Sequence, residues 1–297
     1  MSRRGWILFA SLALIWGLPY MLIRVAVAEL APALLVFGRT ALGACLLLPL
    51  VVVRRGHLRR LVPRWRPILL FTAAEVAVPW LLLSHAEQRL SSSAAGLLVA
   101  CVPLAGALVS RLSGGAEASL GARGVAGLCL GLAGVAALVG LDFRAGDAGA
   151  VAAMLVVVIG YAVGPLVVSR HLADLPSLEV VAVSLAAAAL LYAPAAVLAA
   201  PAAWPSGRVL AAVAALGVAC TAAAFVIFFE LIAEVGPIRA TLVAYLNPAV
   251  AVAAGVLVLD EPFTAGTAAG FVLILSGSYL AAVRPRVAAG VTPPEAG

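Results

Sequence analysis

The chain has 297 residues, of which 65% are hydrophobic and only 11% are charged, and its mean hydropathy is +1.17. A soluble domain carries roughly 25% charged residues, so this composition excludes a soluble globular protein. Runs of about twenty apolar residues recur along the chain, each long enough to cross a hydrocarbon core of ~30 Å. The sequence therefore predicts an all-α integral membrane protein that contacts the lipid bilayer along most of its length.

The net charge of +6 comes from arginines alone on the basic side, because the sequence contains no lysine. These arginines lie in short segments between apolar runs, where they are typical of topology signals, so no nucleic-acid partner is expected. The four cysteines all lie in apolar runs without metal-ligand spacing, which predicts packing residues and no metal site. Because no G-x-x-x-x-G-K-[ST] motif occurs, no nucleotide or other cofactor is expected.

The first apolar run follows two arginines, an order that also begins a secretory signal peptide. The run continues past Trp16 to about Ala28, and many further apolar runs follow it. This length favours a first transmembrane helix over a cleaved leader.

Ten apolar runs separate at charged residues, Pro and Gly along the chain. They predict ten transmembrane helices, at residues 6–28, 34–53, 67–86, 92–111, 122–141, 149–169, 178–199, 209–231, 238–259 and 264–283. The segment 285–297 is predicted to be a disordered cytoplasmic tail.

The distribution of the 19 arginines predicts the orientation of these helices. If the N-terminus is inside, only Arg89, Arg144 and Arg208 fall in outer loops, Arg24 and Arg39 lie near helix ends, and the other fourteen are inside. We therefore expect a multi-pass protein of the cell (cytoplasmic) membrane with both termini in the cytoplasm.

The two halves of the sequence resemble each other at an offset of about 145 positions. The matching positions are Trp16 with Tyr161, Arg39 with Ser184, Pro103 with Pro248 and, after a shift of one or two residues, Glu117 with Glu261 and Gly127 with Gly270. Each half, 1–141 and 147–284, holds five predicted helices, an odd number, so the second half crosses the membrane in the opposite sense. The sequence thus predicts two inverted five-helix repeats, as in many secondary transporters, although Ala-rich helices also align by chance.

The order of several motifs in both halves resembles the EamA family of the drug/metabolite transporter superfamily. These motifs are Trp16-Gly17, Arg39 after PALLVFG, Pro103, Glu117 before GARGVAG, and then LNPAV, DEPFT and the glycines of the last helix. The resemblance spans about residues 6–284. It implies a ten-helix carrier that exports small metabolites, amino acids or drugs by alternating access. Tyr161 and Ser184 depart from their counterparts in the first half, so any charged site is asymmetric.

Glu75 lies within the apolar run FTAAEVAVPWLLL. A carboxylate that faces lipid costs ~2.5–3.5 kcal/mol, so we expect the side chain to face the interior of the bundle. Pro79 has no N–H to offer to the Glu75 carbonyl, which adds a second acceptor at the same depth. This arrangement suits a proton or an amine-bearing solute. The alternative is a structural carboxylate, either protonated or paired with Arg24 or Arg39.

Prolines predict broken helices at corresponding places in the two halves. They are Pro19 with Pro165, and Pro103 with Pro248, while Pro79 accompanies Glu75. Matched interruptions indicate a transport site; the alternative is that these prolines only kink their helices.

Aromatic and amide side chains near these prolines are candidates for the lining of a substrate cavity. They are Trp16, Tyr20, Tyr161, Tyr245 and Asn247. Because Trp16 and Tyr20 are four residues apart, they are expected on one helix face. Simple packing is the alternative for Trp16 and Tyr245.

Three charged or titratable residues near helix ends are candidates for structural or gating roles: Arg39, His85 and Glu230. The family resemblance favours an ion pair for Arg39. Solvated helix ends are the simpler interpretation of His85 and Glu230.

The leading hypothesis is a secondary transporter that exports a small organic solute, in exchange with protons. The alternative is an integral membrane enzyme that acts on a lipid-linked substrate, but the three histidines form no H-E-x-x-H motif and no catalytic residue is assigned. Glycines between Gly121 and Gly134, and in the last helix, predict close helix packing within the carrier or at the face of a homodimer.

Overall fold

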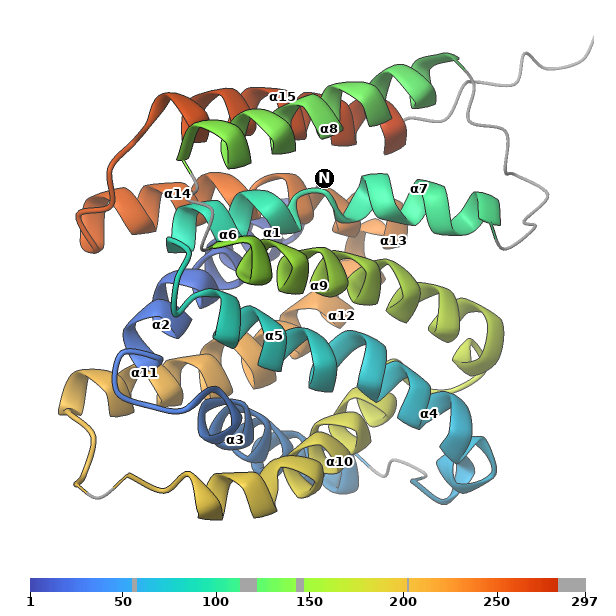
Figure 1. Cartoon of the computed structure of the whole chain (residues 1–297). Helices are drawn as coiled ribbons and strands as arrows, with labels where there is room; N and C mark the ends of the chain where they lie inside the picture. Colours follow the sequence, from blue (N-terminus) through green and yellow to red (C-terminus); the bar gives the residue numbers. More distant parts are fainter. Residues whose placement is uncertain (55–57, 113–121, 143–146, 202, 283–297) are drawn as a thin grey trace, which may run out of the picture.

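The chain folds into a bundle of helices, and the computed structural model describes residues 1–54, 58–112, 122–142, 147–201 and 203–282 (Figure 1). These ranges contain no strand. The α-helices are α1 (Arg3–Gly17), α2 (Pro19–Ala26), α3 (Pro32–Val53), α4 (Trp65–Phe71), α5 (Val78–Ala86), α6 (Ser92–Val99), α7 (Val102–Leu112), α8 (Ala122–Asp142), α9 (Ala148–Val167), α10 (Ser177–Leu198), α11 (Gly207–Gly217), α12 (Ala224–Val235), α13 (Pro237–Ala240), α14 (Asn247–Val258) and α15 (Ala265–Ala282). Between them lie the π-helical turns η2 (Thr72–Ala77), η4 (Val168–Leu172) and η5 (Val218–Ala223), and the 3-10 turns η1 (Leu58–Arg64) and η6 (Thr241–Tyr245).

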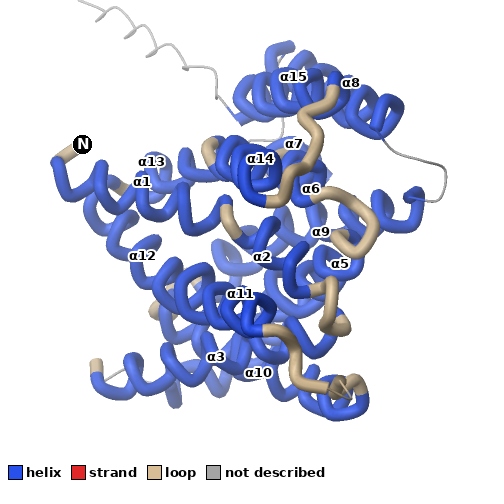
Figure 2. The backbone as a smooth tube through the Cα atoms, turned by 90° about the vertical axis from the view of Figure 1, so that its left-hand side faces the viewer, coloured by secondary structure: helices blue, strands red, loops and turns tan. Residues whose placement is uncertain are grey.

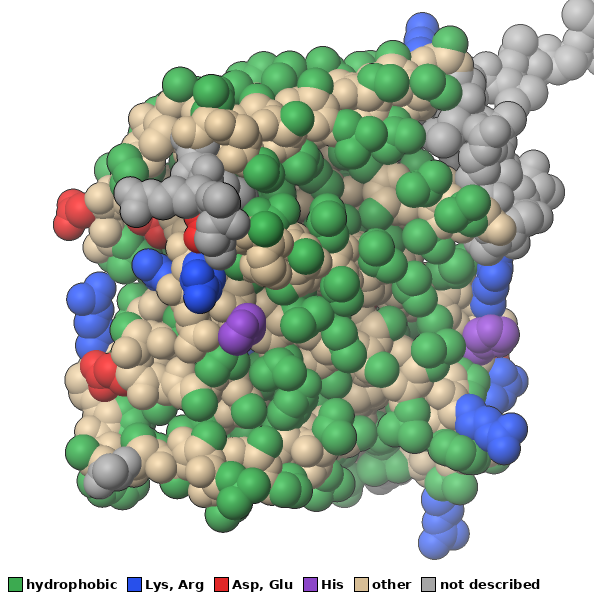
Figure 3. Space-filling view, in the orientation of Figure 1, with side chains coloured by type: hydrophobic (Ala, Val, Ile, Leu, Met, Phe, Trp, Pro, Cys, Tyr) green, Lys and Arg blue, Asp and Glu red, His purple; other side chains and the backbone are tan. Residues whose placement is uncertain are grey.

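Within the described ranges, nine helical segments are long and apolar enough to cross a membrane, and a shorter apolar helix covers Ala265–Leu280. They correspond to the ten predicted spans. Most ends differ by a few residues, but the third segment begins at Leu58 rather than residue 67, and the eighth continues to Val235 rather than residue 231. The all-α membrane fold with ten spans is therefore confirmed. Figure 3 shows charged side chains at two opposite edges of the visible face and hydrophobic side chains between them. The tail at 285–297 lies outside the described residues.

Packing brings together helices that correspond in the two halves. α3 packs against α10, α6 against α14, and α8 against α15. In the same way, the contact of α5 with α9, between the third and sixth spans, corresponds to the contact of α12 with α1, between the eighth and first. Because each contact has a counterpart when the halves are exchanged, and each half crosses the membrane five times, the bundle has the arrangement of inverted repeats.

Several prolines lie in the first turn of a new helix. Leu18 separates α1 from α2, and Pro19 begins α2 at a position where a missing N–H breaks no helical bond. α14 likewise begins at Asn247 with Pro248 in its first turn. Pro103 follows the interruption between α6 and α7.

Pro165 does not break its helix, and the predicted interruption there is wrong. α9 runs through Pro165 to Val167 and continues as the π-helical turn η4. A membrane helix tolerates proline when local π adjustments and neighbouring helices satisfy the freed backbone groups. Pro19 and Pro165 correspond in sequence, but only Pro19 lies at an interruption.

α8 and α15 lie side by side at one edge of the bundle (Figures 1 and 2). Their main chains approach closely at glycines. A Cβ atom added to Gly277 would lie 2.6 Å from the Gly127 carbonyl oxygen and 2.8 Å from the Gly131 Cα, and one added to Gly134 would lie 2.8 Å from the Ile274 nitrogen. Glycine thus permits the van der Waals packing that associates membrane helices.

Gly277→Ala is expected to destabilise the packing of α8 against α15, because the new methyl group would meet main-chain atoms that cannot rotate away. Overpacking of this kind costs about 1–3 kcal/mol. Thermal unfolding of the purified protein in detergent measures the loss. Gly140→Ala on α8 is the matched control, since no atom lies within 4 Å of its added Cβ. Equal stability of the two variants would contradict the close packing of α8 against α15 at Gly277.

Candidate functional site

Two π-helical turns occupy equivalent places in the third and eighth spans. η2 joins α4 to α5 and η5 joins α11 to α12, so that residues 72 and 218, and residues 77 and 223, correspond. In η2 the N–H of Val78 donates to the carbonyl of Ala73, five residues earlier, and Pro79 follows without an N–H of its own. Such turns occur frequently at functional sites.

Glu75 lies in η2 and its side chain faces α9. Gly164 leaves room for it: an added Cβ there would clash with Oε2 and lie 3.0 Å from the Glu75 Cδ. Oε2 is buried, and no described residue provides it with a hydrogen-bond partner. The carboxyl group therefore points into the bundle, and among the described residues it forms no ion pair with Arg24 or Arg39.

Arg39 of α3 faces the other π-helical turn and is only 7% exposed. Its Nε donates to the Thr221 hydroxyl oxygen at 2.9 Å, and that hydroxyl donates to the Leu216 carbonyl at 2.7 Å. The guanidinium carbon lies 3.6 Å from the centroid of the Trp80 ring, a cation–π contact worth ~2 kcal/mol when desolvated. The predicted ion pair is wrong for the described residues, because a hydroxyl and a ring take the place of a carboxylate.

The counterpart of Arg39 is Ser184 on α10, the helix that packs against η2. Ser184 is fully buried, and its hydroxyl has no partner among the described residues. From the same helix, the Tyr192 hydroxyl donates to the Ala77 carbonyl of η2 at 3.0 Å. The repeats thus place a guanidinium at η5 and a carboxyl group at η2, so the two sides of the interior carry different ionisable groups.

Tyr161 and Tyr20 join these groups. The Trp80 indole N–H donates to the Tyr161 hydroxyl, and both tyrosines lie within electrostatic range of the Arg39 guanidinium. Tyr20 is 8% exposed and packs over Gly96 of α6. We call the group Tyr20, Arg39, Glu75, Trp80 and Tyr161 the interior cluster.

The other predicted lining residues lie elsewhere. Trp16 packs against Phe225 and Phe228 of α12, with ring centroids 6.1 and 4.9 Å apart. Although Trp16 and Tyr20 are four residues apart, the break at Leu18 lies between them, and they belong to different hydrophobic clusters. The expectation of a shared helix face is therefore wrong.

Tyr245 and Asn247 lie at the start of α14. The Tyr245 hydroxyl donates to the Ser278 carbonyl of α15 at 3.2 Å. Asn247 lies beside Gly17 at the end of α1, and its Oδ1 is buried without a described partner. The breaks before α2 and before α14 therefore face each other.

At the end of the bundle opposite the N-terminus, carboxylates of one half bind the other half. Glu29 accepts hydrogen bonds from the main-chain N–H and the hydroxyl of Ser206, each at 2.7 Å, and these donors hold the pKa of Glu29 below its usual range. Glu261 accepts from the N–H groups of Ser92 and Ser93 at 2.7 and 3.0 Å, and from the Ser93 hydroxyl at 2.6 Å. His85 is exposed at this end.

Ion pairs join the halves at the N-terminal end. Arg4 pairs with Glu230 at 2.6 Å, and Arg64 pairs with Asp174 at 3.1 Å. Exposed pairs of this kind are worth about 0–1 kcal/mol. A small free energy therefore suffices to separate the ion pairs at the N-terminal end.

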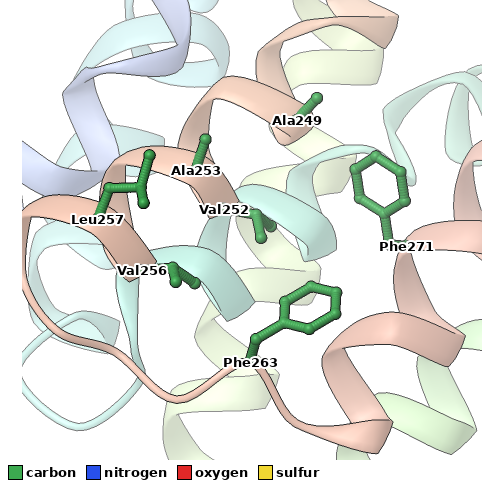
Figure 4. A pocket seen from close by; sticks show the side chains of 7 residues that line it. All are labelled: Ala249, Val252, Ala253, Val256, Leu257, Phe263 and Phe271. Atoms are coloured by element: carbon green, nitrogen blue, oxygen red, sulfur yellow. The ribbon is translucent and has the colours of Figure 1, made fainter.

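A cavity of about 360 Å³ lies between α14 and α15 (Figure 4). Its lining is wholly apolar and consists of Ala249, Val252, Ala253, Val256, Leu257, Phe263 and Phe271. Because these side chains offer no group to a charged solute, the interior cluster is the better candidate for a site.

Comparison with known proteins agrees with this architecture. The model of the EamA-like transporter family matches residues 3–140 and 148–283, one match in each half. The chain belongs to the EamA-like transporter family. This EamA-like protein is a multi-pass membrane transporter, and the interpretation as a membrane enzyme is not supported.

Its relatives include "Uncharacterized inner membrane transporter YedA" of Escherichia coli (strain K12), 33% identical over 290 residues that cover 94% of this chain and 92% of YedA. "Uncharacterized transporter YvbV" of Bacillus subtilis (strain 168) is 24% identical over 284 residues, with the same coverage. A crystal structure of a protein 24% identical in sequence matches with a TM-score of 0.66 and covers 95% of this chain and 97% of its own, which shows the common fold.

Two parts of the site escaped sequence reasoning. When η2 and η5 are matched end to end, Thr221 takes the place of Glu75, and its hydroxyl in an apolar run was the available signal. The stacking of Arg39 on Trp80 joins residues from two different helices, and no local pattern indicates it.

Proposed function

We propose that this EamA-like transporter exports small organic solutes that carry both an ammonium and a carboxylate group, by alternating access and in exchange with protons. The supporting observation is the interior cluster, where Arg39 lies at one π-helical turn and Glu75 at the other. Trp80 and Tyr161 link the two charged residues.

The chemistry of the cluster suits a zwitterion. A guanidinium binds a carboxylate through parallel N–H groups, and because Nε of Arg39 is bound to Thr221, a solute carboxylate would approach the two terminal nitrogens. The solute ammonium would bind Glu75. Since one carboxylate binds either an ammonium or a proton, solute release and proton uptake at Glu75 would alternate.

The repeats and their contacts at both ends of the bundle support alternating access. Rocking of one half against the other would break either the Glu29 and Glu261 contacts or the Arg4 and Arg64 pairs. The arginine bias favours a cytoplasmic N-terminal end, so export would begin with separation of the ion pairs of Arg4 and Arg64.

Uptake of labelled amino acids, amines and aromatic drugs into proteoliposomes tests the proposal, with and without an imposed pH gradient. We expect gradient-dependent flux of a zwitterionic solute, and loss of its pH dependence in Glu75→Gln. Glu230→Gln is the control, because this carboxylate is exposed and pairs with Arg4. If the flux depends neither on the pH gradient nor on the Glu75→Gln substitution, proton exchange at Glu75 is overturned. If only amines are transported, the proposal of a zwitterionic solute is overturned.

A further inference from the structure

A second carboxyl group, Glu87, is buried at the end opposite the N-terminus. It directly follows α5, in the connector to α6, and its side chain is 0% exposed. Both carboxylate oxygens are buried, and neither has a hydrogen-bond partner among the described residues. Arg24 Nη1 donates instead to the main-chain carbonyl of Glu87. Buried polar groups are nearly always bonded, so this side chain requires an explanation.

Charged and titratable groups on four segments of the chain lie within electrostatic range of Glu87. They are Tyr20 and Arg24 on α2, Arg39 on α3, Tyr161 on α9 and Glu261 in the connector between α14 and α15. Burial raises the pKa of Glu87 well above its usual range, and the neighbouring carboxylate of Glu261 adds to this effect, while Arg24 and Arg39 oppose it.

The energetics favour a neutral acid. An ionised carboxylate without a partner in the interior costs several kcal/mol, and the adjacent charge of Glu261 increases that cost. A structural carboxylate would be expected to accept hydrogen bonds, as Glu261 does from Ser92 and Ser93. Glu87 therefore differs in kind from Glu261.

We propose that Glu87 is a proton-binding site distinct from Glu75. Glu87 holds its proton while the contacts between the two halves at this end of the bundle are intact, and it releases the proton when those contacts break. In the release step the O–H bond breaks, the proton passes to water, and the carboxylate remains beside Arg24. The link to transport rests on the proposed proton exchange; the binding of the proton itself does not.

Infrared difference spectroscopy of the purified full-length protein in lipid nanodiscs tests the site without any solute. The probe is pH alone, and the readout is the C=O stretching band of protonated carboxylic acids. Glu87→Gln is expected to remove one band that titrates above the usual range of glutamate, whereas Glu230→Gln leaves it in place. An unchanged spectrum in Glu87→Gln would overturn the proposal.

Stability against pH provides a second readout. Because the folded pKa of Glu87 lies above its unfolded value, the native state binds more protons between the two values, and the free energy of unfolding falls as pH rises through that window. Glu87→Gln resembles the neutral acid, so it is expected to lose this dependence and to match the wild type at acid pH. An identical pH dependence in both proteins would contradict the proposal.

Glu261→Gln leaves Glu87 itself unchanged, so it tests the proposal even if Glu87→Gln does not fold. Removal of the Glu261 charge is expected to lower the pH at which the Glu87 band titrates. A band that titrates at an unchanged pH would contradict the proposed interaction between Glu87 and Glu261. In flux measurements, Glu87→Gln is expected to exchange solute but not to accumulate it against a gradient. The Glu87 band could titrate in a protein whose flux does not depend on the pH gradient. That result would support proton binding at Glu87 and overturn the proposed proton exchange.

Discussion

Gly160→Ala is expected to lower transport strongly while most of the bundle stays folded. A Cβ atom on Gly160 of α9 would lie 2.5 Å from the Ala74 carbonyl oxygen and 2.9 Å from the Pro79 Cγ. Both belong to the segment around η2, and neither can rotate aside, because one is main chain and the other is a ring. The π-helical turn that holds Glu75 would have to move away from α9.

The size of the effect follows from the packing cost. Overpacking costs about 1–3 kcal/mol, which corresponds to a change of roughly 5–150-fold in the population of a competing conformer. Flux of the solute in proteoliposomes measures the loss, and thermal unfolding measures stability in parallel.

Gly149→Ala is the matched control for this experiment. It lies in the first turn of the same helix, and no atom lies within 4 Å of its added Cβ. We expect it to transport as the wild type does. If Gly160→Ala also kept full transport, the position of η2 against α9 would not matter for function.

The ten spans followed from the sequence because the thickness of the hydrocarbon core imposes a length on each apolar run. The repeat was visible for a related reason: Arg39 with Ser184 and Pro103 with Pro248 keep one spacing in both halves. These features depend on local composition and on periodicity, and both are properties of the chain alone.

Side-chain contacts between distant segments could not be predicted in this way. Arg39 meets Thr221 across 182 residues, and a lone arginine in a membrane span suggested a carboxylate partner instead. The π-helical turn at η5 has no proline to mark it, unlike η2, which precedes Pro79. Pro165 shows the reverse case, because a proline that resembled a helix breaker was accommodated by the turn that follows it.

Glu87 was visible in the sequence only as a polar residue at the end of a span. Such residues are usually solvated, and the neighbouring His85 is indeed exposed. The difference arises from tertiary packing, because the helix end that exposes His85 buries Glu87. A pattern of single residues does not distinguish the two sides of a helix end.

Arg39→Met is expected to abolish the preference of the transporter for solutes that carry a carboxylate. Methionine retains an unbranched apolar side chain beside Trp80 but removes the charge. Loss of one partner of a buried charge pair costs about 2–5 kcal/mol of binding, which is more than a tenfold change in affinity. The measurement compares flux of the amino acid that the wild type carries best with flux of the amine that lacks its carboxylate.

Removal of the solute carboxylate and the Arg39→Met substitution are the two changes of a double-mutant cycle. If the carboxylate binds Arg39, its removal weakens transport by the wild type but has little effect in Arg39→Met. Arg39→Lys keeps the charge and loses the planar fork, so it is expected to fall between the two. A structural role for Arg39 would lower the transport of both solutes by the same factor, because damage to the fold cannot distinguish a solute with a carboxylate from one without it.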